Sequence, residues 1–191
     1  MKLKYNSPTI LTFTFISVAV LALDQFLFPN LIKGWFSVPG RGDFHFGIRN
    51  VVNLFTHVIG HADWPHLVGN FSIILLVGPM LEMRYGSKDM ILMMVITALA
   101  TGLLNVLFFM TGLFGASGVV FMMILLASFT NFKKGEIPLT FILVLFLYLG
   151  QQIIEAFQHD NISQFTHIAG GVLGSLFGFW GRREEKDHEQ R

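Results

Sequence analysis

The sequence predicts an all-α membrane protein, a single domain built as a bundle of six transmembrane helices with both termini in the cytoplasm. Three observations lead to this fold class. Of the 191 residues, 53% are hydrophobic and only 13% are charged, whereas soluble domains carry roughly 25% charged residues. Six apolar stretches follow one another along the chain. The basic residues gather in every second connection between these stretches.

The composition also excludes several classes of protein. A chain of this length has too large a surface to be covered by so few charges. An ordinary cytosolic domain, a disordered chain and a nucleic-acid-binding protein are therefore excluded. The sequence contains no cysteine, which excludes disulfides, thiolate metal sites and cysteine nucleophiles.

The six apolar stretches are long runs that only helices carry across lipid, because a helix satisfies its own backbone hydrogen bonds. They cover residues 9–28, 66–83, 90–111, 117–130, 137–157 and 164–181. Most of them approach the roughly 20 residues that cross a hydrocarbon core of about 30 Å. The domain thus spans residues 1–191, with an outer loop at about 29–65. Its cytoplasmic tail, at about 182–191, is expected to be a helix extension or a disordered end.

The basic residues predict the orientation, because Lys and Arg accumulate in cytoplasmic loops. With the N-terminus in the cytoplasm, ten of the thirteen basic residues lie on the cytoplasmic side. They are Lys2, Lys4, Arg84, Lys88, Lys133, Lys134, Arg182, Arg183, Lys186 and Arg191. Alternatively, the first stretch is a signal peptide that is cleaved near Ala22. Its removal would leave an odd number of spans and spoil the charge pattern.

The outer loop mixes aromatic residues with Gly and Pro. Its aromatic residues include Trp35, Phe36, Phe44, Phe46 and Trp64. Such side chains gather at the boundary between lipid and water. The loop is therefore predicted either as an amphipathic element lying in the membrane interface or as a plain connector, and the sequence leaves both alternatives open.

Polar residues inside spans need an explanation, because lipid disfavours them. They occur at positions 61–70, 115–118 and 166–170, at the outer starts of the second, fourth and sixth stretches. Counted back from the cytoplasmic ends of their stretches at about 1.5 Å per residue, Asn70, Ser117 and His167 each lie about 21 to 22 Å from that end. The three places therefore share one layer inside the membrane.

The fourth stretch is too short to cross the bilayer, so it begins inside the membrane at Ser117. Non-helical backbone at that depth must be surrounded by protein or water, which predicts a cavity open to the outer side. A helix N-terminus has free N–H donors and favours negative charge. This position suits a serine that attacks a carbonyl, because donors for the developing oxyanion are already in place.

Two other helices bring polar side chains to the same layer. Pro65 fits a first helical turn, and His66 and Asn70 then lie four residues apart on one face. In the sixth stretch a stripe of small residues lies on the face of His167 and allows a close helix contact. The stripe is formed by Gly170, Gly174 and Gly178. If its partner is the helix that starts at Ser117, His167 comes within reach of that serine.

Each feature also has a structural interpretation. Small residues in membrane helices usually serve packing, and His66 with Asn70 can be a structural hydrogen-bond pair. His57, His61 and His66 suggest a metal site only weakly. No acidic or Cys ligand lies at a matching depth, and no His-Glu-x-x-His motif is present. We therefore predict neither a metal nor a cofactor.

Over about residues 50–182 the chain resembles the rhomboid intramembrane serine proteases. Three motifs carry the resemblance, in this order: His61-x4-His66-x3-Asn70, Gly115-Ala-Ser117-Gly118 and His167-Ile-Ala-Gly170-x3-Gly174. The segment Leu81-Glu82-x-Arg84-x-Gly86-Ser87 also resembles the family's loop between the second and third spans.

The resemblance implies a six-helix rhomboid-like bundle with a Ser-His dyad, in which Ser117 is the nucleophile and His167 the general base. It also implies an oxyanion hole made by His66, Asn70 and the backbone N–H of Ser117. Gly115 would keep the preceding loop close to this hole. The other implied supporting residues are His61, Gly118 and Phe121. The loop at about 157–164 would cap the site, and the fifth span would border the substrate's lateral entry.

Two positions depart from the pattern of the family. A Trp-Arg pair is frequent in the outer loop, where this chain has Val52 and Asn53, with Arg49 one turn earlier. The anchoring of the loop is therefore expected to differ. Phe121 stands where Tyr is common, so it can stack on His167 but offers no hydroxyl.

We predict a multi-pass membrane protein of the bacterial inner membrane. As an intramembrane serine endopeptidase it would cleave transmembrane segments of other proteins; its partners are these substrates and the lipid bilayer, not nucleic acid. One alternative is a non-catalytic rhomboid-like protein that binds membrane helices. A small proton-linked transporter is a third interpretation, which the lack of inverted repeats disfavours.

Overall fold

The computed structural model describes residues 5–128, 139, 142–143, 146–147 and 161–189. Its helices are α1 (Pro8–Phe26), α2 (Leu31–Trp35), α3 (Ile48–Thr56), α4 (Trp64–Phe108), α5 (Ser117–Ser128) and α7 (Asn161–Glu189). In these ranges there is no β-sheet, only an isolated antiparallel bridge between Val38 and Leu113. The predicted all-α class is confirmed for this part of the chain.

Helix α4 is a helical hairpin of 45 residues whose backbone bends at Gly86 (φ 82°, ψ 160°). A positive φ is available to glycine without steric cost, which explains the residue at the bend. The two arms, 64–85 and 87–108, correspond to the second and third predicted stretches. Each arm is about 33 Å long and can cross a bilayer.

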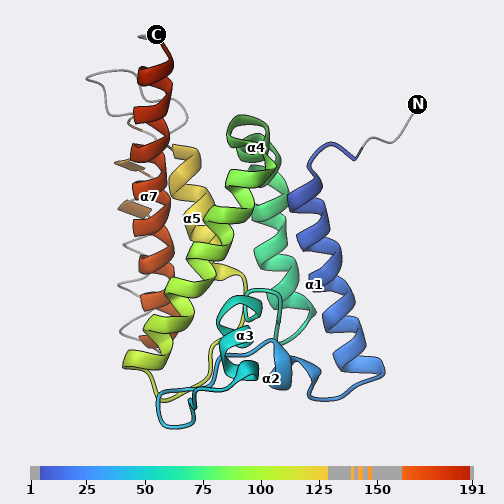
Figure 1. The fold of residues 1–191 in the computed structure, drawn as a ribbon. Coiled ribbons are helices and arrows are strands. Elements are labelled where there is room, and N and C mark those ends of the chain that lie inside the picture. Colours follow the sequence, from blue (N-terminus) through green and yellow to red (C-terminus); the bar gives the residue numbers. More distant parts are fainter. Residues whose placement is uncertain (1–4, 129–138, 140–141, 144–145, 148–160, 190–191) are drawn as a thin grey trace.

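The bend of α4, the start of α1 and the end of α7 lie together at one end of the bundle (Figure 1). We call it the Gly86 end. Helices α2 and α3 lie at the opposite end, called the α3 end (Figure 1). The charge pattern predicts that the Gly86 end faces the cytoplasm.

Among the described residues, α1 and α4 are long and apolar enough to cross a membrane. Ser117–Ser128 and Phe165–Phe179 are shorter apolar helices. The predicted fifth stretch, 137–157, lies mostly outside the described residues. The six-span topology and the cytoplasmic termini therefore stay predictions.

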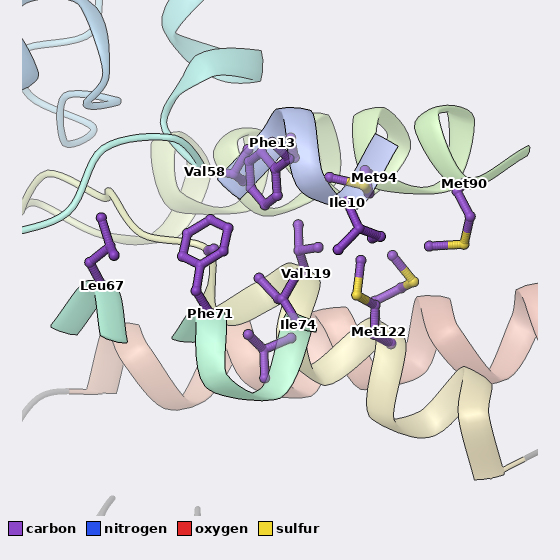
Figure 2. Close-up of a cluster of buried hydrophobic side chains, with 14 of the residues drawn as sticks. Ile10, Phe13, Val58, Leu67, Phe71, Ile74, Met90, Met94, Val119 and Met122 are labelled. Carbon is purple, nitrogen blue, oxygen red and sulfur yellow. The ribbon is translucent and has the colours of Figure 1, made fainter. Parts of the chain in front are cut away.

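The core lies where α1, both arms of α4 and α5 meet (Figure 2). The rings of Phe13 and Phe71 join α1 to the first arm of α4, with centroids 5.1 Å apart. Met90, Met94 and Met122 line the other side of this core. Methionine adapts its shape to irregular gaps, which suits a junction of helices that cross at different angles.

The outward faces of the helices carry large apolar side chains. Exposed examples occur on α1, on both arms of α4 and on α7, namely Phe15, Leu76, Leu92, Leu103 and Leu176. Apolar surface of this extent is rare on soluble monomers. It is the surface expected of helices that face lipid.

Glu82 joins α4 to the start of α1 at the Gly86 end. Its carboxylate accepts hydrogen bonds from the backbone N–H groups of Thr9 (2.9 Å) and Ile10 (3.1 Å) and from the Ser87 hydroxyl (2.7 Å). The first N–H groups of a helix have no partner within the helix, and a negative charge is favourable there. Glu82 therefore caps α1 from a neighbouring helix.

Helix α7 is longer at both ends than the predicted stretch 164–181. It begins at Asn161 and continues to Glu189, so the tail is a helix extension over most of its length. Apolar runs mark only the part of a helix that crosses lipid, which explains the short prediction. His167 therefore lies nearly two turns into its helix. Of the predicted capping loop, 161–164 is helical, and 157–160 lies outside the described residues.

Candidate active site

Helix α5 begins inside the bundle. After α4 ends at Phe108, residues 109–116 run without helical structure from the α3 end into the interior, and α5 starts at Ser117 (Figure 1). Its 12 described residues span about 18 Å. The predicted helix start at Ser117 is confirmed, whereas the predicted end at residue 130 lies outside the described residues.

Segment 109–116 is held by hydrogen bonds from three directions. Val38 and Leu113 exchange two backbone hydrogen bonds of 2.9 Å. The Asn105 amide donates to the Thr111 carbonyl at 3.1 Å. The N–H of Gly115 donates to the His57 carbonyl at 2.9 Å. Backbone buried away from water needs such partners, and they hold the approach to Ser117 in one conformation.

His61 supports the residue directly before Ser117. Its Nδ1 lies 3.0 Å from the Ile59 carbonyl, and its Nε2 accepts the N–H of Ala116 at 3.4 Å. A carbonyl only accepts, so Nδ1 carries the proton and the ring is neutral. Burial lowers the pKa of His61 to about 4, which agrees with a neutral ring.

His57 is the second buried histidine behind this segment. Its Nε2 donates to the Ala98 carbonyl at 3.0 Å, which ties the end of α3 to the second arm of α4. Burial lowers the pKa of His57 to about 4. Within the described residues its Nδ1 has no hydrogen-bond partner.

The first turn of α4 places His66 beside Gly115. The Asp63 carboxylate accepts the N–H of His66 at 2.8 Å and caps the helix, with Pro65 in the first turn. Gly115 has φ +123°, and a Cβ there would lie 2.8 Å from Cε1 of the His66 ring. The positive φ favours glycine at position 115, and any larger side chain there would collide with the His66 ring in its present position.

Asn70 lies one turn after His66 on α4. Its side chain is 8% exposed, and its Nδ2 has no acceptor among the described residues. A buried donor without a partner costs free energy. The amide is therefore available to an oxygen of a bound molecule after a small rearrangement.

Helices α5 and α7 touch backbone to backbone. A Cβ at Gly170 would lie 2.1 Å from the carbonyl oxygen of Gly118, and a Cβ at Gly174 would lie 2.2 Å from that of Met122. Gly178 is also buried on α7. The glycine stripe thus packs against α5 through Gly170 and Gly174, which brings the residues beside Gly118 and Gly170 close together.

His167 and Phe121 lie across this contact. Their rings are stacked, with centroids 4.2 Å apart and planes inclined by 8°. Phe121 is one turn after Ser117 on α5. Among the described residues no hydrogen bond joins the Ser117 hydroxyl to the His167 ring.

The predicted site residues thus form two adjoining groups. One consists of His61, His66 and Gly115, whose rings and backbone are in contact; the centroids of the two imidazoles are 5.0 Å apart. The other group lies at the contact between α5 and α7 and contains Gly118, Phe121, His167 and Gly170. Segment 115–118 connects the two groups.

A cavity of about 410 Å³ opens beside His61 at the α3 end. Phe114 and Gly112 of the segment before α5 also line it. Ser117 and His167 are not in its lining. In the part of the chain that the structure describes, no group of three or more His, Asp or Glu side chains is placed to hold a metal ion.

The sequence interpretation missed two supporting roles. His57 was considered only as a metal ligand, although its carbonyl holds Gly115. Asn53 was noted only as a departure from a family pattern, whereas its amide donates to the carbonyls of Ser37 (2.8 Å) and Gly34 (3.3 Å). Arg49 also donates to the Gly34 carbonyl. No sequence signal singled out Asn53, because α3 also carries Arg49, Asn50 and Thr56.

The fold and this site define a class: a helical membrane protein with a short helix that starts at a serine inside the bundle. The sequence profile of the Rhomboid domain matches residues 49–184. The chain belongs to the rhomboid family, whose members are integral membrane proteins.

Curated relatives agree with this assignment. The chain is 24% identical to Rhomboid protease GlpG of Haemophilus influenzae over 65% of its length, and 27% identical to that of Serratia proteamaculans over 91%. It is 29% identical to RHOMBOID-like protein 1 of Arabidopsis thaliana over 69% of its length. The chain spans 66%, 62% and 34% of these relatives, respectively.

Proposed function

We propose that this protein is an intramembrane serine endopeptidase that cleaves transmembrane segments of other membrane proteins. The bacterial relatives carry the name protease. The observation that carries the proposal is the contact between α5 and α7, in which Gly170 packs on Gly118 and the His167 ring stacks on Phe121. This contact supports the proposal that the His167 imidazole accepts a proton from the Ser117 hydroxyl.

In the proposed reaction Ser117 is the nucleophile and His167 is the general base. The His167 ring takes the hydroxyl proton as Ser117 Oγ attacks the peptide carbonyl, and the protonated ring then gives its proton to the leaving amine. A water molecule deprotonated by His167 hydrolyses the acyl-enzyme. The Ser117–His167 hydrogen bond would form with substrate bound, since catalytic hydrogen bonds are often long in empty sites.

The oxyanion of the tetrahedral intermediate needs donors that are already oriented. We assign this role to the Asn70 amide, the His66 ring and the backbone N–H of Ser117. The unpartnered Nδ2 of Asn70 supports the assignment, as does the contact between His66 and Gly115. Removing one oxyanion donor typically lowers kcat by about 10²- to 10³-fold.

The proposal also covers location and substrates. The protein would lie in a bacterial inner membrane as a six-span bundle with cytoplasmic termini. Its substrates would be transmembrane helices that unwind near the α3 end, and no cofactor would be needed. A substrate helix would enter the site laterally from the lipid bilayer, past the predicted fifth span.

The test uses purified protein with a detergent-solubilised transmembrane substrate and a serine-directed fluorophosphonate probe. We expect cleavage and labelling by the wild type, and loss of both in Ser117→Ala. His167→Ala should lose cleavage and labelling for lack of a base. Ser128→Ala is the matched control, because Ser128 also lies on α5 and, among the described residues, its hydroxyl donates only to the Ile124 carbonyl.

The alternative is a non-catalytic rhomboid-like protein that binds membrane helices. It predicts that the wild type retains a transmembrane peptide without cutting it and does not react with the probe. Equal cleavage by Ser117→Ala and the wild type would overturn the assignment of the nucleophile.

A further inference from the structure

A second cavity lies at the α3 end, between α2, α3 and the segment that joins them. Its volume is about 390 Å³, within the range of small-ligand sites. Three charged side chains line it: Lys33, Asp43 and Arg49. Neither the proposed catalytic residues nor their supporting histidines belong to its lining.

The charges in this cavity are not neutralised by each other. In the described ranges no ion pair joins Lys33, Asp43 or Arg49 to another side chain. Two cations and a carboxylate around one hollow are complementary to a ligand that carries both signs. A purely anionic ligand would face repulsion from Asp43.

The guanidinium of Arg49 is held in place. Its Nε donates to the Gly34 carbonyl, and its central carbon lies 5.8 Å from the centroid of the Trp35 ring. An oriented guanidinium is well suited to phosphate, which it can bind through two parallel hydrogen bonds.

The surroundings of the cavity favour a position at the depth of lipid headgroups. Helix α3 buries Asn53 and Leu54 and exposes its other apolar side chains, and aromatic side chains are exposed at the end of α2 and in the loop before α3. The exposed residues are Trp35, Phe46, Ile48, Val51, Val52 and Phe55. A helix that shows its apolar side outward and carries flanking aromatics lies in the membrane interface.

We propose that this cavity binds the headgroup of a phosphatidylethanolamine molecule from the leaflet at the α3 end. Lys33 and Arg49 bind the phosphate, and Asp43 accepts hydrogen bonds from the primary ammonium. A quaternary ammonium has no N–H to donate to Asp43, and a glycerol headgroup has no positive charge. Phosphatidylcholine and phosphatidylglycerol should therefore bind more weakly.

The experiment is native mass spectrometry of the full chain in detergent with an equimolar mixture of the three lipids, all with the same acyl chains. We expect the wild type to carry mainly one phosphatidylethanolamine. Lys33→Ala should reduce this adduct about tenfold, and Asp43→Asn should remove the preference over phosphatidylglycerol. Thermal unfolding of each variant checks that it is folded.

Lys88→Ala and Asp89→Asn are the matched controls, since they remove an exposed cation and an exposed carboxylate at the Gly86 end. Both should keep the wild-type adduct. Equal retention of the three lipids by the wild type, or an unchanged adduct in Lys33→Ala and Asp43→Asn, would overturn the proposal.

A final competition experiment distinguishes binding of the lipid from binding of its soluble headgroup. Excess glycerophosphoethanolamine should not displace the lipid, because it lacks the acyl chains that contact the apolar face of α3. Displacement of the lipid by this excess would assign the site to a soluble ligand and overturn the lipid proposal. Binding is measured without proteolysis, so the result does not depend on the proposed protease activity.

Discussion

The imidazole of His167 and the ring of Phe121 form a parallel stack across the contact between α7 and α5, with their centroids 4.2 Å apart. The stack restricts the rotation of the His167 ring. Phe121 lies one helical turn after Ser117 on α5, so in the proposed reaction the stack would help to orient the imidazole toward the serine. The effect on catalysis can be tested without removing either proposed reacting group.

Phe121→Leu should lower the rate of cleavage by about two- to tenfold and leave the protein folded. Aromatic pairs contribute about 0.5–1.5 kcal/mol beyond the area that they bury, and a loose imidazole spends less time in the reactive orientation. Phe121→Tyr keeps the ring and should keep the rate within about twofold. The measurement is kcat with a transmembrane substrate, and a Leu variant as fast as wild type would show that the stack does not orient the base.

Gly170→Ala should destabilise the protein strongly, whereas Gly171→Ala should not. A Cβ at Gly170 would lie 2.1 Å from the Gly118 carbonyl, but a Cβ at Gly171 would lie 3.6 Å from its nearest neighbour, in ordinary contact. Overpacking costs about 1–3 kcal/mol or more, while Ala at a tolerant helical position is up to about 1 kcal/mol better than Gly.

Thermal unfolding in detergent measures the difference between these two variants. The variant Gly170→Ala should also lose fluorophosphonate labelling, because separation of α5 from α7 moves His167 away from Ser117. Equal unfolding temperatures for the two variants would contradict the backbone contact.

Gly115→Ala should abolish or strongly reduce cleavage. The new Cβ would meet the His66 ring at 2.8 Å, and φ +123° is unfavourable for alanine. Gly86→Ala is the matched control for backbone strain, since Gly86 also has a positive φ but has no atom within 4 Å of the Cβ position. It should lower stability by roughly 1–3 kcal/mol and keep the activity per folded molecule.

Stability should fall as the pH drops from about 6.5 toward 4. Burial lowers the pKa of both His57 and His61 to about 4, so the unfolded chain binds more protons in this window. The stabilising contribution is complete above pH 6.5 and is lost as the pH falls through the window. Each histidine changes the free energy of unfolding by at most about 1.4 kcal/mol per pH unit.

Unfolding curves between pH 7.5 and 4.5 measure this slope. The groups that face His61 are Asp63 and His66, and a proton on Nε2 would break its bond with the Ala116 N–H. His57→Asn should have a shallower pH dependence than the wild type. A wild-type unfolding temperature that is constant over this range would contradict the neutral buried rings.

The sequence alone determined the all-α class, the rhomboid resemblance and the start of the helix at Ser117. Hydropathy and helix-breaking residues indicate where an apolar helix begins along the chain, so these features were predictable. The chemistry of the site and the membrane layer shared by Asn70, Ser117 and His167 stay predictions. Pro65 was predictable from local backbone geometry, because proline fits a first helical turn. A role for Gly115 was expected only from the resemblance, and its positive φ came from the structure.

Only the tertiary structure decided which side chains meet. The rotation of each helix about its axis and the distance between axes depend on packing of the whole bundle, which no local pattern encodes. The stack of Phe121 on His167 and the packing of Gly170 on Gly118 were possibilities that the sequence could not decide, because they depend on how α5 and α7 lie against each other. The capping of α1 by Glu82 and the support of Gly115 by the carbonyl of His57 were not predicted, because hydrogen bonds between distant segments leave no periodic signal in the chain.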